Sequence, residues 1–105
     1  MPRQSQTMEV KIKLSIDRID RASQMLKAIA HPIRLSILDI LESGGKYCVS
    51  EIHEALNIEQ AVASQHLKIL KDKDVIDSEK DGKHCFYFLK HKALGKIVEC
   101  VQSCE

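Results

Sequence analysis

Residues 48–71 constrain the fold more than any other stretch, because they contain two short helical patterns separated by a turn signal. The first pattern, residues 50–56, places apolar side chains at the i, i+3, i+4 spacing of one helix face, and Ser50 is its candidate N-cap. Asn57 tolerates the left-handed conformation that ends many helices. The second pattern covers residues 60–72. This stretch therefore predicts a helix-turn-helix.

The second helical pattern has two faces of different chemistry. Ala63, Leu67 and Leu70 form an apolar face suited to a core. The opposite face carries small and polar side chains, which are Gln60, Ala61, Ser64, Gln65 and Lys68. Amides bond to adenine, methyl groups contact thymine and lysine reaches guanine or phosphate, so this face suits the major groove of DNA. A surface helix in a small bundle shows a similar face, and the helix pair alone leaves both interpretations open.

Two strand patterns follow, at residues 75–80 and 83–89, on either side of Asp81 and Gly82. Asp-Gly between two such runs is a strong hairpin signal, and we expect positive φ at both turn positions. A hairpin that directly follows a groove-binding helix is a wing. The basic residues expected near its tip are Lys80, Lys83 and His84. The wing favours DNA binding over a plain helical bundle.

At 105 residues, with 44% hydrophobic and 30% charged side chains, the chain has the composition of one globular domain. Its net charge of +1 leaves nucleic-acid binding open, because basic groups can gather on one side of a neutral protein. No apolar run is long enough to span a membrane, and the first residues lack the apolar core of a signal peptide. We therefore expect a cytoplasmic protein with no membrane partner. Without a glycine-rich phosphate loop or a nucleophile motif, the sequence does not predict an enzyme.

The remaining segments predict the domain's organisation. Residues 1–14 are polar and are expected to form a mobile arm, whereas residues 15–105 form one DNA-binding and dimerisation domain. Residues 32–41 are apolar nearly all round, which is typical of a central buried helix. Helices predicted at residues 15–29 and 92–104 have apolar faces broader than one small core needs. These first and last helices are therefore expected to form a homodimer.

Together these segments resemble the ArsR/SmtB family of metal- and thiol-responsive bacterial repressors. The matching stretches are LKAIAHPIRLSILDIL (26–41), CVSEIHEAL (48–56), QAVASQHLKILKDKDVI (60–76) and DGKHCFYFL (81–89). The resemblance implies a mainly α, homodimeric winged helix-turn-helix with a small β-hairpin, in the order α-α-α-α-β-β-α. It also implies a repressor that binds an inverted-repeat operator in double-stranded DNA and releases it when a ligand binds or thiols oxidise.

By position, the resemblance assigns DNA contacts to the polar face of the second helix and to Lys83 and His84 of the wing. Glu59 departs from the family, which often has a serine cap there. Its negative charge complements a helix start. The same charge would lie close to DNA phosphates and would weaken binding.

The four cysteines are candidates for sensing a signal. In a reducing compartment they are expected to be free thiols. Cys100 and Cys104 are four residues apart on one predicted helix face and can chelate Zn(II) or another thiophilic metal or metalloid, with Cys48 or a residue of a second subunit as third ligand. They can instead respond to oxidants or reactive sulfur, or fill an apolar dimer seam. Cys85 falls at an inward strand position and is predicted to lie in the core.

The family's known metal sites are incomplete in this chain. Cys48 matches the first cysteine of the family's C-V-C arsenic motif, but Ser50 stands at the second. The family's Asp-x-His pair on the last helix is His91-x-Ala93 here. Two alternatives therefore stay open, namely a constitutive DNA binder without a cysteine sensor and a winged-helix module for protein contacts. Salt-dependent binding to an inverted repeat separates DNA binders from the protein-contact module.

Overall fold

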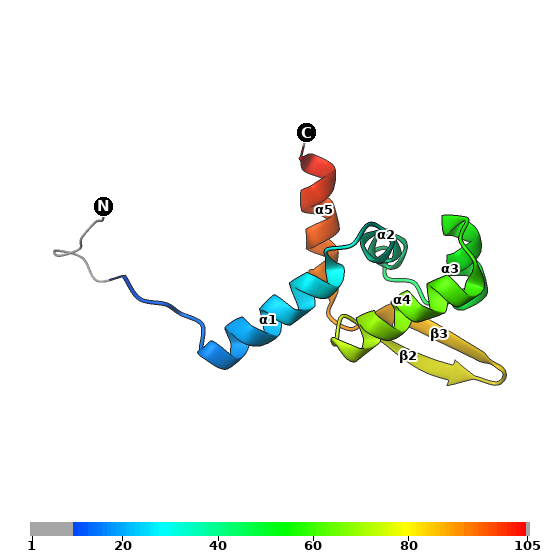
Figure 1. Ribbon diagram of the computed structural model, residues 1–105, viewed down its shortest axis with the longest axis horizontal. Helices are drawn as coiled ribbons and strands as arrows, with labels where there is room; N and C mark the ends of the chain where they lie inside the picture. Colours follow the sequence, from blue (N-terminus) through cyan, green and yellow to red (C-terminus); the bar gives the residue numbers. More distant parts are fainter. Residues whose placement is uncertain (1–9, 105) are drawn as a thin grey trace.

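The computed structural model describes residues 10–104, in which five α-helices pack together and a small sheet lies at one edge (Figure 1). Of the predicted mobile arm, residues 1–9 lie outside the described part, and residues 10–14 form neither helix nor strand. The mainly α winged helix-turn-helix is confirmed. In the described residues, no helix has the length and apolar character needed to cross a membrane.

The first two helices begin at local capping signals. Helix α1 covers Ile16–Ile29, and the Ser15 hydroxyl accepts the backbone N–H of Arg18 at 3.2 Å. Helix α2 covers Pro32–Leu41, with proline in its first turn. Its N-cap is His31, whose Nδ1 accepts the N–H of Ile33 at 3.1 Å. Proline and the cap together separate α1 from α2.

A short strand that no sequence pattern predicts changes the start of the next helix. Strand β1, Tyr47–Cys48, leads directly into α3, Val49–Leu56, so the predicted N-cap at Ser50 is wrong. The N-cap is Cys48, and its backbone N–H donates to Glu51 Oε1 at 3.0 Å. The helix starts early because pairing in the sheet holds the chain extended up to Cys48.

The sheet has three antiparallel strands in the order β1-β3-β2, in place of the two-stranded hairpin predicted. Strand β2 covers Ile76–Asp81 and β3 covers His84–Leu89. The chain then forms a short 3-10 helix, Lys92–Leu94, before α5, Gly95–Ser103.

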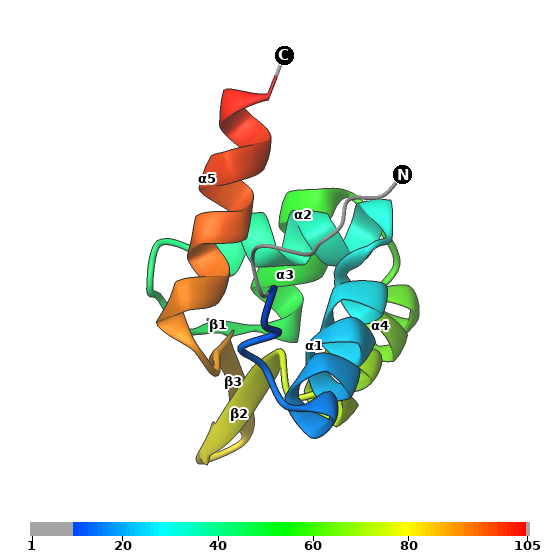
Figure 2. The same cartoon turned by 90° about the vertical axis from the view of Figure 1, so that its left-hand side faces the viewer.

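Helix α2 is the centre of the core, as its all-round apolar pattern predicts. It packs against α1, α3, α4 (Gln60–Asp72), α5 and the sheet. The residues with no exposed surface are Ile37, Leu38, Leu41, Ile52, Ala63, Leu67, Leu70 and Val75. Helix α5 contacts α2 at its base and projects beyond the rest of the body in both views (Figure 1, Figure 2).

Candidate nucleic-acid interface

Helices α3 and α4 form the predicted helix-turn-helix, joined by residues 57–59. Asn57 has φ 56° and ψ 47°, the left-handed conformation expected there. His53 closes this turn twice. Its carbonyl accepts the N–H of Ile58 at 3.1 Å, and its Nδ1 lies 3.1 Å from the Ile58 carbonyl oxygen. Because a carbonyl oxygen only accepts, Nδ1 of His53 carries the proton in this bond.

The two-faced character predicted for α4, which we call the recognition helix, is confirmed by its burial. Its core face is fully buried through Ala63, Leu67 and Leu70. The candidate base-contacting residues are all exposed, and they are Gln60, Ala61, Ser64, Gln65 and Lys68. The recognition helix therefore presents amides, a hydroxyl, a methyl group and an ammonium group to solvent along one side. Their contacts with DNA remain a prediction.

Two lysines of the recognition helix have different surroundings. Lys68 Nζ lies 3.2 Å from Asp72 Oδ2, in an ion pair whose side chains are 75% and 59% exposed. Such a pair contributes little stability, so Lys68 can exchange Asp72 for a phosphate. Lys71 Nζ instead donates to Ser78 Oγ at 2.8 Å, which joins the recognition helix to β2.

The N-terminus of the recognition helix has no side-chain cap. Glu59 occupies the N-cap position, and its carboxylate makes no capping hydrogen bond. Only its carbonyl is used, as acceptor for the N–H of Ala63 at 3.0 Å. The first-turn N–H groups of this helix are therefore not satisfied by a cap, while a negative charge lies beside them.

The wing is confirmed, but its turn is one residue later than predicted. Asp81 pairs with His84, so the loop consists of Gly82 and Lys83. Of these described turn residues only Gly82 has positive φ, at 67°. A two-residue loop with positive φ at its first position has the II′ geometry, which matches the twist of the strands. Positive φ at both Asp81 and Gly82 was therefore the wrong expectation.

The hairpin register separates the three basic wing residues, although all three are exposed. Directly opposite residues share a face of the sheet, and Lys80 pairs with Cys85. The same face carries Ser78, which receives Lys71 of the recognition helix. His84 lies on the other face, with its ring centroid 6.0 Å from that of Phe86. Lys80 is thus on the α4 side of the wing, Lys83 in its loop and His84 on the outer side.

Lys46, which precedes β1, braces the outer face of the sheet. Its Nζ donates to both carboxylate oxygens of Glu79 in β2, at 2.8 and 3.0 Å, and lies 5.3 Å from the centroid of the Phe88 ring. Lys46 and Glu79 are 33 residues apart, so no local sequence signal could identify this contact.

The three candidate sensor cysteines do not form one site among the residues described for a single protomer. Cys48 is half-buried at the start of α3, whereas Cys100 and Cys104 are exposed. Helix α5 ends at Ser103 and Cys104 is its C-cap, so the helix predicted to end at about Cys104 is confirmed to within one residue at this end. Within residues 10–104, no group of three or more His, Cys, Asp or Glu is arranged to hold a metal.

Two further residues, Cys85 and His66, are half-buried and differ in this from the exposed candidate residues. Cys85 is only half-buried and is not part of the buried core predicted for it. Burial together with the adjacent Cys85 thiol raises the pKa of Tyr87. His66 is half-buried against α2 and not among the exposed residues of α4. It supports the recognition helix from behind.

Known proteins are similar to this chain in sequence and in fold. The sequence model of the family described as bacterial regulatory protein, arsR family, matches residues 31–78. The transcriptional repressor SmtB of Mycobacterium tuberculosis is 41% identical over 81 residues, which are 76% of this chain and 58% of that protein. The arsenical resistance operon repressor of Staphylococcus aureus is 35% identical over 77 residues, which are 73% of each protein.

A solved structure has the same arrangement of elements. The homodimeric winged helix-turn-helix DNA-binding domain of a possible ArsR-family regulator from Mycobacterium bovis superimposes with a TM-score of 0.74 at 25% identity, covering 90% of this chain and 87% of that one. The chain thus spans less than two thirds of the SmtB repressor but most of the arsenical resistance repressor. From the matched helix-turn-helix, the shared wing and these identities, we conclude that this chain belongs to the ArsR family of bacterial regulatory proteins.

Proposed function

We propose that the protein is a dimeric, sequence-specific DNA-binding repressor. The observation that carries this proposal is the exposed polar face of the recognition helix, held beside a basic wing on a rigid core. Gln60 and Gln65 offer amides for adenine, Ala61 offers a methyl group for thymine, and Lys68 is free to exchange its surface ion pair for guanine or phosphate. Lys80 and Lys83 reach the backbone from the wing.

The operator is an inverted repeat in double-stranded DNA, because a two-fold symmetric dimer presents two recognition helices related by the same symmetry. Apolar side chains left exposed on the first and last helices support dimerisation through these elements. On α1 they include Ile16 at 83% and Leu26 at 55% exposure, and on α5 they include Val101 at 48%. Single exposed apolar residues are ordinary, but several on the first and last helices favour an interface.

The exposed thiols of Cys100 and Cys104 are the proposed sensor of the signal that releases DNA. Cys100 and Cys104 lie at the end of the helix proposed to form the dimer, where oxidation or binding of a thiophilic metal or metalloid would alter the interface. A metal site would need ligands from both subunits, since three do not converge within the described part of one chain. Replacing both cysteines with serine keeps the shape and removes the thiol chemistry.

Operator binding is tested by fluorescence anisotropy with DNA from upstream of the protein's own gene, at several salt concentrations. Gln65→Ala should cost about 1–3 kcal/mol and relax sequence preference, because it removes one bidentate base contact. Lys68→Ala should lower the salt slope by about 0.9. Lys96→Ala, an exposed lysine on α5, is the matched control and should leave both quantities unchanged. Unchanged affinity in Gln65→Ala and Lys68→Ala at moderate salt would contradict the proposed interface.

The proposed sensor is tested by measuring binding of the same DNA in reducing buffer and then after addition of Zn(II), As(III) or a mild oxidant. Release in the wild type but not in a Cys100→Ser, Cys104→Ser variant identifies a thiol sensor and its trigger. Tight binding that ignores every treatment contradicts a cysteine-based sensor and leaves a constitutive DNA binder.

A further inference from the structure

The segment before α1 has one apolar side and one basic side. Val10, Ile12 and Leu14 alternate with Lys11 and Lys13. In an extended chain, residues at i, i+2 and i+4 lie on the same side. The three apolar side chains are 92%, 78% and 51% exposed. So much apolar surface in one short segment favours a binding partner.

The segment cannot fold back onto the centre of its own chain. It continues α1 away from the sheet and from α3, toward one end of the long axis (Figure 1). Helix α1 has 14 residues and is therefore about 21 Å long, with α2 beginning at its far end. Ile12 is only three residues from Ser15, which caps α1, and three extended residues span about 10 Å. Ile12 therefore does not reach the start of α2 in its own protomer.

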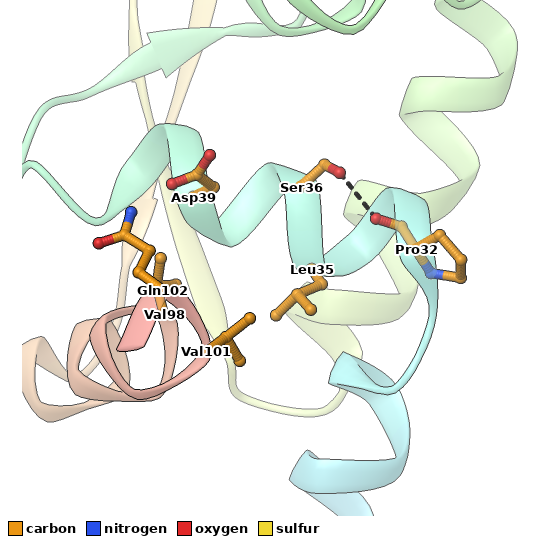
Figure 3. Close-up of a pocket in the computed structure, with 7 residues that line it drawn as sticks. All are labelled: Pro32, Leu35, Ser36, Asp39, Val98, Val101 and Gln102. Atoms are coloured by element: carbon orange, nitrogen blue, oxygen red, sulfur yellow. Dashed lines mark hydrogen bonds between the residues drawn. The ribbon is translucent and has the colours of Figure 1, made fainter. Parts of the chain in front are cut away.

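A groove that would accept such a segment lies between α2 and α5. It encloses about 180 Å³ and is lined by Pro32, Leu35, Ser36, Asp39, Val98, Val101 and Gln102. Figure 3 shows Leu35 and Val101 toward one end, with Asp39 and Gln102 at the other. A dry cavity of about 150 Å³ admits a benzene-sized group, so this groove has room for one branched aliphatic side chain.

The polar end of the groove complements the basic side of the segment. Asp39 is exposed and has no ion pair or hydrogen bond among residues 10–104. Lys13 neighbours Ile12 and projects to the opposite side of an extended chain. With Ile12 seated beside Leu35 and Val101, Lys13 starts on the far side of the segment, and its long flexible stem lets the ammonium group return to the exposed Asp39 carboxylate at the rim of the groove.

We propose that residues 10–14 of one protomer dock in the α2–α5 groove of the second protomer, with Ile12 in the apolar part and a flanking lysine near Asp39. This inference rests on the dimer of the proposed function and extends its interface. Val101 belongs both to the groove and to the exposed apolar face of α5. The segment is likewise continuous with α1, the other helix of the proposed interface. Each protomer then covers the α5 groove of its partner.

Site-directed disulfide formation tests the docking in the full chain. The background carries Cys100→Ser and Cys104→Ser, so that the exposed native thiols do not compete. Ile12→Cys and Ser36→Cys are made as separate proteins, mixed and oxidised. A disulfide forms only when the two Cα atoms approach to about 4.4–6.8 Å. Because each protein carries one introduced thiol, a bond between them is necessarily between subunits.

We expect a covalent dimer from the mixture and little from either protein alone. Lys13→Cys mixed with Ser36→Cys is the matched control and should react much less, since residue 13 projects to the other side. As a second measurement, Ile12→Asp should raise the dimer dissociation constant by about tenfold, measured by sedimentation. Lys13→Asn should change it far less.

The results that would contradict the docking differ from those that would contradict the dimeric repressor. A chain that sediments as a dimer but gives no cross-link above the controls overturns the docking and leaves the proposed function intact. Equal reaction of positions 12 and 13 also overturns it. A chain that stays monomeric at all concentrations overturns both the docking and the dimeric repressor.

Discussion

The ring of His66 in the recognition helix lies 4.7 Å from the ring of His31, centroid to centroid, at an interplanar angle of 41°. His31 is also the N-cap of α2, where its Nδ1 accepts the Ile33 N–H. One imidazole therefore starts the central helix and supports the recognition helix. Arg34, in the first turn of α2, adds a fixed positive charge to the same cluster.

This cluster predicts a pH dependence of stability. Burial, followed by the charges of His31 and Arg34, lowers the pKa of His66 below the ordinary histidine value of 6.5. The unfolded chain therefore binds a proton more readily than the folded chain, and stability is fully present above about pH 6.5 and falls as the pH drops through that value. Thermal unfolding at pH 7.5 and 5.5 should show this loss, and His66→Gln should reduce its size. An identical pH response in both proteins would contradict the assignment.

Glu59 predicts a separable effect on stability and on DNA affinity. Glu59→Ser supplies a hydroxyl to the uncapped first turn of the recognition helix and should stabilise the protein by up to about 1 kcal/mol. Glu59→Gln removes the charge without adding a good cap. Both should bind DNA roughly two- to fivefold more tightly at low salt, because a negative charge near phosphate is gone. Only Glu59→Ser should unfold at higher temperature, and equal melting of the two variants would be inconsistent with the missing cap.

Glycine-to-alanine substitution should lower the free energy of unfolding at Gly82 and raise it at Gly95. Gly82 has φ 67°, and a Cβ there would meet nothing within 4 Å, so Gly82→Ala costs only backbone strain, about 1–2 kcal/mol. Gly95 has φ −62°, and its added Cβ would make an ordinary contact 3.6 Å from Cβ of Glu42. Gly95→Ala should therefore stabilise by about 0.4–1 kcal/mol. Urea unfolding measures both, and a loss of stability in each would argue against the conformations described.

The central position of α2 predicts a large effect of one core truncation. Leu38 has no exposed surface, so Leu38→Ala should lower the free energy of unfolding by about 2–5 kcal/mol. That is a large part of the stability of a small domain. Ile69→Ala, at a side chain 37% exposed on the recognition helix, should cost about 1 kcal/mol or less. Urea unfolding of both variants checks the ratio, and similar losses would contradict the burial.

Local patterns in the sequence were sufficient for the helices, apart from the start of α3, and for the two faces of the recognition helix. Ser15, Pro32 and Asn57 mark helix ends through their own backbone and side-chain chemistry. The apolar spacing of Ala63, Leu67 and Leu70 shows which side is buried, because helical periodicity is a local property. The exposed candidate contact residues follow directly from that face.

Only the tertiary structure decided the contacts that join distant segments. Because β1 pairs with β3, α3 begins at Val49 and not after Ser50. Strand β1 has only two residues, which are too few for a strand pattern to be recognised in the sequence. The hairpin register put Lys80 and His84 on opposite faces, since a shift of one residue exchanges the two sides of a strand. The contacts of Lys46 with Glu79 and of His31 with His66 arise from packing between elements. Sequence spacing describes neighbours along one element, whereas these relationships depend on how separate elements meet.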